Sequence, residues 1–222
     1  HDFVITEHHA VFLDSPIVFD VANLGKGPMV QWRPDNGTRI GVMPRHGTGD
    51  EIRWFEIDPG HVQHFWNGWA EGSRIEFSGT RFEHPDFGIG ADAELDESTA
   101  DNQPPYPTRF WVDLEANTSG WEQTDVLGGD CARFNDDFNG VRSRFHYMSA
   151  VIDTDRRLGD FDTIVRYDEV SGERQLWNAG ANGHVGESSN MNVAFVTADG
   201  VLRHPKFDHI LAGCTSLRAL EL

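Results

Sequence analysis

The sequence predicts an all-β protein, and three observations support that prediction. Apolar residues recur in short runs with the alternation typical of strands, and helical periodicity is scarce throughout the 222 residues. Glycine is frequent (23 residues) and proline modest (10), which suits many short strands joined by tight turns. Two segments that resemble each other place Asp113 and Asp168 at matching positions, 55 residues apart. Because this spacing is near the length of a propeller blade, the repeat favours a β-propeller over a sandwich.

The predicted strands follow one another closely along the chain. A tight hairpin is expected where residues 29–33 and 40–45 flank the turn Pro34-Asp35-Asn36-Gly37, because Asn-Gly suits such turns. The acidic run at 92–101 lies in a stretch of low hydrophobicity that leads to Pro104-Pro105, and we expect it to be an exposed loop. The other predicted strands cover residues 11–13, 17–21, 52–57, 62–66, 74–77, 109–114 and 121–127.

The segment 54–71 places imidazoles in a run that is otherwise apolar and aromatic. It is predicted to form two short strands around Pro59-Gly60. Strand alternation would put His64 on one side with Val62 and Trp66, and His61 on the other side. A buried neutral imidazole needs partners for its nitrogens, and either a backbone group or a metal ion can serve. From the residues alone, a core histidine bonded to a backbone carbonyl is the more common of the two.

Composition excludes several classes of function. The net charge is −18 and the chain has only 18 Lys and Arg, which argues against a nucleic-acid partner. Cys131 and Cys214 lie far apart and outside any Cys-x-x-Cys pattern, so neither a zinc site nor a disulfide framework is predicted. No signal-peptide core and no apolar run near 20 residues occurs. The chain begins at His1 inside a strand-like pattern, so we expect residues to be missing before it.

Three motifs, in order, resemble the carotenoid cleavage oxygenase family, which includes the lignostilbene dioxygenases. The first is the opening His-Asp-Phe, followed by Thr6. The second is Trp54-Phe55-Glu56 followed by His64-Phe65-Trp66-Asn67-Gly68-Trp69-Ala70-Glu71, in which Gly68 replaces the usual Ala. The third is the stretch 130–140, which resembles a Glu-Phe-Pro-Arg-Ile-Asn motif and has Asp130 at the Glu position. The resemblance covers residues 1–187 and implies roughly half of a seven-bladed propeller.

The resemblance also implies a chemistry. Members of this family use oxygen and ferrous iron, held by four histidines on the propeller axis, to cleave a carbon–carbon double bond. The second and third of those histidines correspond to His1 and His64, and the carboxylates that support them correspond to Asp130 and Glu187. Neutral imidazoles suit Fe(II), and supporting carboxylates fix their tautomers. Asp130 is one methylene shorter than Glu, so its reach is an open question. The other nine histidines share no spacing, and we expect them to be solvated or locally bonded.

The last 36 residues resemble a different family. The segment from Glu187 to Leu217 is similar to the branched-chain aminotransferases of the pyridoxal-phosphate fold-type IV class. There the counterparts of Glu187 and Thr215 would hold the pyridine nitrogen and the phosphate. Nothing upstream resembles the surroundings of the lysine that these enzymes need. We therefore expect an oxygenase-like propeller part at 1–186 and an unrelated, α+β-like tail at 187–222; a diverged propeller tail is the alternative.

These inferences predict an Fe(II) dioxygenase that acts on an apolar carotenoid, apocarotenoid or stilbene-type substrate with O2. Family enzymes work in the cytoplasm and draw on membranes, so peripheral membrane contact is expected. The first and fourth histidines have no counterpart in the sequence, and we expect little or no cleavage by this polypeptide alone, because two imidazoles make a poor iron site. The alternatives are an all-β chain without catalytic function and, less favoured, a fragment of a pyridoxal-phosphate enzyme.

Overall fold

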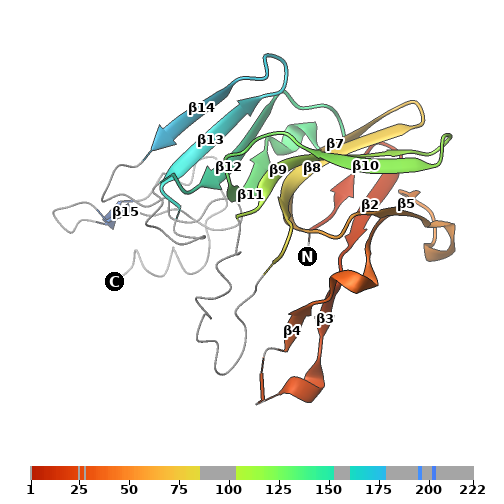
Figure 1. Cartoon of the computed structure of the whole chain (residues 1–222). Helices are drawn as coiled ribbons and strands as arrows, with labels where there is room; N and C mark the ends of the chain where they lie inside the picture. The colour runs from red at the N-terminus through yellow and green to blue at the C-terminus, as the bar shows by residue number, and fades with distance from the viewer. Residues whose placement is uncertain are drawn as a thin grey trace.

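A computed structural model describes residues 2–24, 26–27, 29–85, 104–152 and 161–178, and the backbone of two short strands at 195–196 and 202–203. In these residues the regular structure consists of β-strands and short 3-10 turns. Three antiparallel sheets of four strands form an arc, with one sheet packed behind the next (Figure 1). We call these sheets the first, second and third blade. None of them closes on itself, and the arrangement is that of a partial β-propeller.

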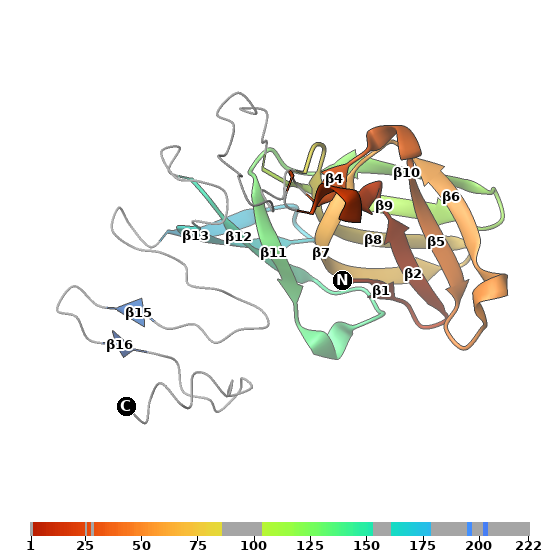
Figure 2. The ribbon, with the colours of Figure 1, turned by 90° about the horizontal axis from the view of Figure 1, so that it is seen from below.

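Each blade is a sheet of four antiparallel strands, and the three sheets can be followed from a second direction in Figure 2. The first blade contains β1 (Val4–Ile5), β2 (His9–Asp14), β5 (Thr38–Pro44) and β6 (Arg53–Ile57). The second contains β7 (His61–Glu71), β8 (Arg74–Phe82), β9 (Tyr106–Asp113) and β10 (Thr118–Gln123). The third contains β11 (Gly129–Phe134), β12 (Phe145–Ala150), β13 (Thr163–Asp168) and β14 (Arg174–Asn178). Strand β7 contacts both β1 and β11, so the inner strands of the three blades lie together.

The blades are held together by two hydrophobic cores. The larger core lies between the first and second blades and includes Ile40, Phe77 and Phe110, each at most 1% exposed. The smaller core lies between the second and third blades and is built on Trp66, Met148 and Val165. Such apolar burial is the main stabilising contribution where sheets pack face to face.

The repeat seen in the sequence is confirmed as a structural repeat. Asp113 ends β9 and Asp168 ends β13, and each begins the turn to the outermost strand of its blade. The Asp113 Oδ1 accepts hydrogen bonds from the backbone N–H groups two and three residues later, and Asp168 Oδ1 does the same in its turn. The two segments are therefore equivalent hairpins of consecutive blades, closed by the same side-chain turn.

The hairpin predicted between residues 29–33 and 40–45 does not form. Strand β4 (Val30–Trp32) pairs with β3 (Ile17–Phe19), and this β3–β4 hairpin projects from the first blade (Figure 1). Strand β5 pairs with β2 and β6, and residues Pro34–Asn36 form a 3-10 turn. The reason is burial, because β5 places Ile40 and Val42 in the larger core, and this outweighs the local preference of an Asn-Gly turn.

Some predictions fall on residues outside the described part of the chain. The acidic loop at 92–101 lies wholly there, and so does most of the tail at 187–222, apart from the backbone of β15 (Phe195–Val196) and β16 (Leu202–Arg203). The domain boundary at 186/187 therefore stays a prediction. Within the described residues, no helix has the length and apolar character needed to cross a membrane.

Candidate functional site

Strand β7 carries the candidate site, and its pairing with β8 is irregular. Register shifts occur on both sides of Phe65, between Val62 and Phe65 and between Phe65 and Gly68. The alternation predicted for this strand is therefore wrong. Val62 and Phe65 lie in the larger core, whereas Trp66 lies in the smaller one. A bulge of this kind inserts an unpaired residue and turns the side chains next to it, and β-bulges are common beside functional sites.

The side chain of His64 points from β7 toward β11, the inner strand of the third blade. Its Nδ1 lies 3.0 Å from Oδ1 of Asp130, and both side chains are largely buried, at 20% and 10% exposed. Because a carboxylate accepts hydrogen bonds, this contact places the imidazole proton on Nδ1 and the lone pair on Nε2. Thr80 of β8 is fully buried and donates its hydroxyl to the same Asp130 oxygen at 2.6 Å. Three strands from two blades thus fix one histidine ring.

Asp130 is directed toward His64 by an unusual backbone. The next residue, Cys131, has φ of 59°, in the left-handed region that non-glycine residues seldom adopt. The β11–β12 register shifts between Asp130 and Arg133, so this is a second bulge. The aspartate is one methylene shorter than a glutamate, and the structure shows that it still makes a hydrogen bond with the imidazole.

His61 lies on the same strand and has a different environment. Its Nδ1 lies 3.1 Å from the Ser15 hydroxyl, and its ring is tilted against Phe82. Burial, which disfavours the charged imidazolium, lowers the pKa of His61 to about 4. His61 is therefore neutral at physiological pH, with a local hydrogen bond, as expected for one of the nine other histidines.

Of the residues expected to form a metal centre, the structure describes His64 and Asp130. The pairing of His64 with Asp130 suits a metal, because a neutral imidazole with its other nitrogen bonded to a carboxylate is the arrangement of metal-ligating histidines. His1 and Glu187 lie outside the described residues, so the structure does not place them. Among the residues that are described, no group of three or more His, Cys, Asp or Glu side chains could hold a metal ion.

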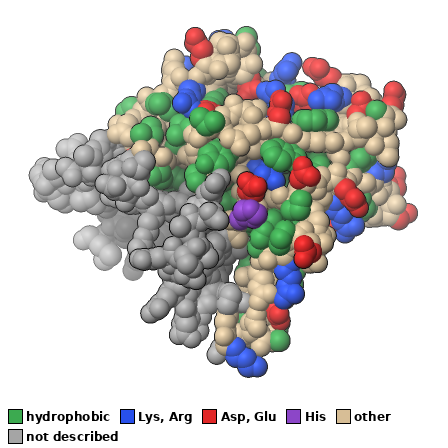
Figure 3. Space-filling model, in the orientation of Figure 1, with side chains coloured by type: hydrophobic (Ala, Val, Ile, Leu, Met, Phe, Trp, Pro, Cys, Tyr) green, Lys and Arg blue, Asp and Glu red, His purple; other side chains and the backbone are tan. Residues whose placement is uncertain are grey.

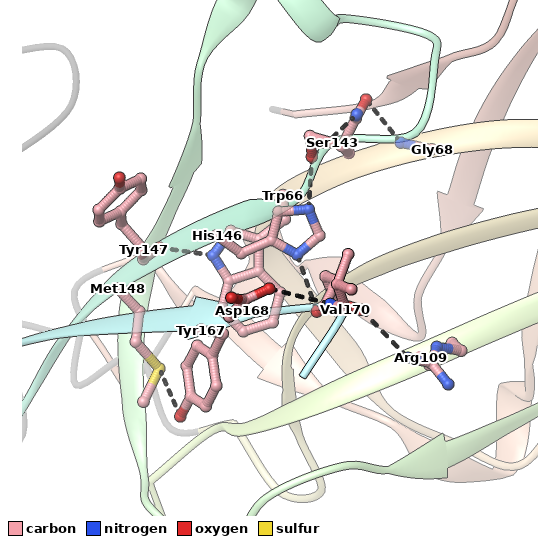
Figure 4. A network of polar contacts seen from close by, with 12 residues as sticks. Trp66, Gly68, Arg109, Ser143, His146, Tyr147, Met148, Tyr167, Asp168 and Val170 are labelled. Atoms are coloured by element: carbon pink, nitrogen blue, oxygen red, sulfur yellow. Dashed lines mark hydrogen bonds and ion pairs between the residues drawn. The ribbon is translucent and has the colours of Figure 1, made fainter. Parts of the chain in front are cut away.

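A second network clamps β7 to the third blade (Figure 4). The Trp66 ring stacks on His146 of β12 with centroids 5.6 Å apart, and its indole N–H donates to the Tyr147 carbonyl. Asn67, 2% exposed, donates to the carbonyls of Phe138 and Val141 at 3.0 and 2.6 Å. These contacts hold β7 immediately after His64, where the irregular pairing with β8 gives less support.

His146 has a hydrogen-bond partner at Nε2 and a carboxylate close to Nδ1 inside this network. The Nε2 lies 2.7 Å from the Ser143 hydroxyl, and Nδ1 lies 3.2 Å from Glu169, which also pairs with Arg109 (Figure 4). The order Ser, His, Glu is that of a hydrolytic triad. Ser143 is 2% exposed and His146 fully buried, so no substrate can reach the hydroxyl, and the network joins blades instead. Sequence patterns gave no signal for it, because its members come from separate strands and loops.

The surface carries both signs of charge. Figure 3 shows acidic and basic side chains interspersed over one face of the molecule, without a broad basic area. The acidic side chains on this face are in keeping with the net charge of −18.

The sequence of the chain matches a known protein family. The sequence model of the retinal pigment epithelial membrane protein family matches residues 1–199. The chain belongs to this family. It is the family of the carotenoid cleavage oxygenases, to which the sequence motifs pointed, and the match continues beyond Glu187.

Named relatives of the chain are oxygenases. A carotenoid 9,10(9',10')-cleavage dioxygenase of Crocus sativus is 26% identical over 179 residues, which cover 79% of this chain and 32% of the relative. An isoeugenol monooxygenase of Pseudomonas putida is 33% identical over 129 residues, which cover 57% of this chain and 26% of the relative. The chain thus spans between about a quarter and a third of these relatives.

Solved structures confirm the fold. The match to the lignostilbene dioxygenase of Pseudomonas brassicacearum covers 91% of this chain and 44% of that enzyme, with a TM-score of 0.70 and 21% identity. The match to a cobalt-substituted Synechocystis apocarotenoid oxygenase covers 90% of this chain and 42% of that enzyme, with a TM-score of 0.72 and 23% identity. The arc of three blades is therefore part of a carotenoid oxygenase propeller, as the sequence predicted.

Proposed function

We propose that this chain forms part of a non-haem Fe(II) oxygenase that cleaves a carbon–carbon double bond of a carotenoid, apocarotenoid or stilbene-type substrate. The observation that carries the proposal is the buried hydrogen bond between His64 and Asp130, on the inner strands of adjacent blades. In the overall reaction the double bond breaks, and each of its two carbons gains one oxygen atom of O2 to become a carbonyl.

The metal would be held by imidazoles of the inner strands. His64 would coordinate through Nε2, and His1 would be a further ligand. Asp130 would keep the proton of His64 on Nδ1, and Glu187 would support another ligand of the set. Bound iron would supply oxygen activation, which no protein side chain provides. The cobalt-substituted neighbour supports a metal centre in this fold.

The substrate class is supported by the relatives, whose names denote enzymes of carotenoids, isoeugenol and lignostilbene. Each of these compounds has a conjugated double bond, and most of its surface is apolar. The aromatic residues next to His64, Phe65 and Trp66, are 5% exposed and packed in the two cores, so they do not line a substrate path. Other residues would therefore have to line the substrate path.

Peripheral membrane contact is proposed at the β3–β4 hairpin. Three apolar side chains of this projection are more than 60% exposed, namely Phe19, Val21 and Leu24. Apolar side chains on a projecting element can enter the interfacial layer of a bilayer, where an apolar polyene would be dissolved.

Iron analysis of the purified chain tests the metal assignment. We expect the iron bound per chain to be below one equivalent and to fall further in His64→Ala. The matched control is His84→Ala, because His84 is exposed and lies next to Glu83 at the surface. Equal iron in the wild type and His64→Ala would contradict the assignment.

Cleavage is measured separately, with apocarotenoid and stilbene substrates under labelled oxygen. We expect little or no carbonyl product from this polypeptide alone, because two of the four imidazoles of the family centre have no counterpart in its sequence. One equivalent of Fe(II), lost in both His1→Ala and His64→Ala and accompanied by labelled carbonyl products, would instead show a complete working centre. Absence of iron and of product would favour the alternative, an all-β chain without catalytic function.

A further inference from the structure

The backbone N–H of Phe65 has an unusual partner. Phe65 is opposite Gly79 of β8 between the two register shifts, and β7 is the edge strand of its sheet, so an N–H group directed away from β8 has no partner in that sheet. Its hydrogen bond goes to Oδ2 of Asp2, at 2.9 Å and 63 residues away in sequence. A backbone donor left unpaired in a partly buried position costs free energy comparable to a lost hydrogen bond, so this contact satisfies a donor of an edge strand.

The two carboxylate oxygens of Asp2 have different roles. Oδ1 accepts from the backbone N–H of Phe3 at 3.0 Å, a local contact that fixes the side chain against its own backbone. Oδ2 is directed away from this turn to the second blade. A local turn needs only one oxygen, so the second contact is not explained by turn formation. A carboxylate also makes a stronger hydrogen bond to an N–H group than a neutral acceptor does.

This contact lies next to a candidate ligand in the sequence. Phe65 directly follows His64, and Asp2 directly follows His1. Consecutive Cα atoms are about 3.8 Å apart across a peptide bond, so fixing Phe65 through Asp2 restricts the backbone at His64. We propose that Asp2 is a positioning residue, which holds the β7 backbone beside His64 across the boundary between the first two blades. This inference rests on the metal centre proposed above.

The test compares Asp2→Ala and Asp2→Asn with Asp14→Ala. Asp14 is the matched control, because it is an exposed carboxylate of the same blade, paired only with Arg39 at the surface, and its removal changes the net charge equally. Two quantities are measured on the full chain, namely the hydrogen-exchange rate of the Phe65 amide and the affinity for Co²⁺ by equilibrium dialysis.

We expect Asp2→Ala to raise the Phe65 exchange rate about tenfold or more, while the amide of Val165 in the distant third blade is unchanged. Cobalt affinity should fall about 10- to 100-fold, the usual loss when a group that orients a metal ligand is removed. Asp2→Asn, which keeps one acceptor oxygen, should lie between the wild type and Asp2→Ala in both measurements. Asp14→Ala should match the wild type.

Three results would overturn the inference, and they are distinguishable. Unchanged Phe65 exchange in Asp2→Ala would show that Asp2 does not hold β7. Faster exchange with unchanged cobalt affinity would show that it holds the strand without positioning a ligand. A wild-type chain that binds no cobalt would reject the proposed metal centre itself, and with it the role of Asp2.

Discussion

Asp130 reaches His64 although its side chain is shorter than that of the glutamate found at this position of the family motif. The contact measures 3.0 Å, and it is made from a bulged strand whose next residue, Cys131, is in the left-handed region. Sequence comparison identified Asp130 as a candidate but could not say whether it reaches the ring, because bulges and positive φ angles leave no reliable pattern in a single sequence. Thr80, which orients the carboxylate, was missed for the same reason.

Cys131 gives the first prediction. Cys131→Val should lower the free energy of unfolding by about 1–2 kcal/mol, because a β-branched side chain is disfavoured at positive φ. Cys131→Gly should be within about 0.5 kcal/mol of the wild type, because glycine adopts this conformation freely. Urea denaturation measures both. Equal losses in the two variants would mean that the side chain, and not the backbone conformation, is what matters at this position.

His61 gives a prediction about pH. Its pKa in the folded chain is about 4, below the ordinary value of 6.5, so the unfolded chain binds the proton more readily between these values. The stability that neutral His61 contributes should therefore be fully present above pH 6.5. The free energy of unfolding should fall by about 3 kcal/mol as the pH is lowered from there to 4. In His61→Gln this part of the pH dependence should be absent. Parallel pH profiles for the two proteins, from urea denaturation, would contradict it.

At the scale of elements, β7 connects the two cores and the candidate site. The sequence predicted a strand here and singled out His64, but it predicted regular alternation, whereas two register shifts divide the strand between the cores. The hairpin prediction at 34–37 was wrong for a related reason, because it used local turn preference and the pairing of β5 is decided by burial. Patterns local to one segment could identify the strands and the repeated hairpins, but not how the strands pair over long distances.

The bulge in β7 depends on Gly79 of β8. A Cβ atom at Gly79 would lie 2.8 Å from the His64 carbonyl oxygen and 2.9 Å from a Val62 methyl group. Gly79→Ala should therefore push β7 away and cost about 1–3 kcal/mol of unfolding free energy. Gly49→Ala is the control, because nothing lies within 4 Å of its Cβ position. A loss in Gly79→Ala no larger than that in Gly49→Ala would show that β7 accommodates the methyl group.

At the scale of the molecule, the outer face of the third blade is open. Ile164 and Trp177 are opposite each other on β13 and β14, and both are exposed, whereas Met148 and Val165 on the other face are buried against the second blade. Propeller blades bury both faces when a neighbour packs on each side. Composition and the 55-residue repeat could predict a propeller part from the sequence, but the face left uncovered depends on the order of the blades in space.

This open face predicts self-association of the chain. An exposed apolar sheet face with unpaired edge strands promotes aggregation. Ile164→Lys combined with Trp177→Lys should raise the monomer fraction in sedimentation velocity without changing the circular dichroism of the sheets. Val170→Lys is the control, because Val170 is an exposed apolar residue in the turn beyond β13. A wild-type chain that is fully monomeric and melts cooperatively would contradict the prediction.

The central claim is that His64, with its proton held on Nδ1 by Asp130, is a metal ligand. The most direct measurement is a nuclear magnetic resonance titration of the chain with Co²⁺, because paramagnetic broadening locates even a weakly bound ion. We predict a ¹⁵N shift pattern for His64 with the proton on Nδ1, and broadening by substoichiometric Co²⁺ that begins at His64 and Phe65. Broadening that begins at surface histidines such as His8 and His84, with the signals of His64 unchanged, would contradict the claim.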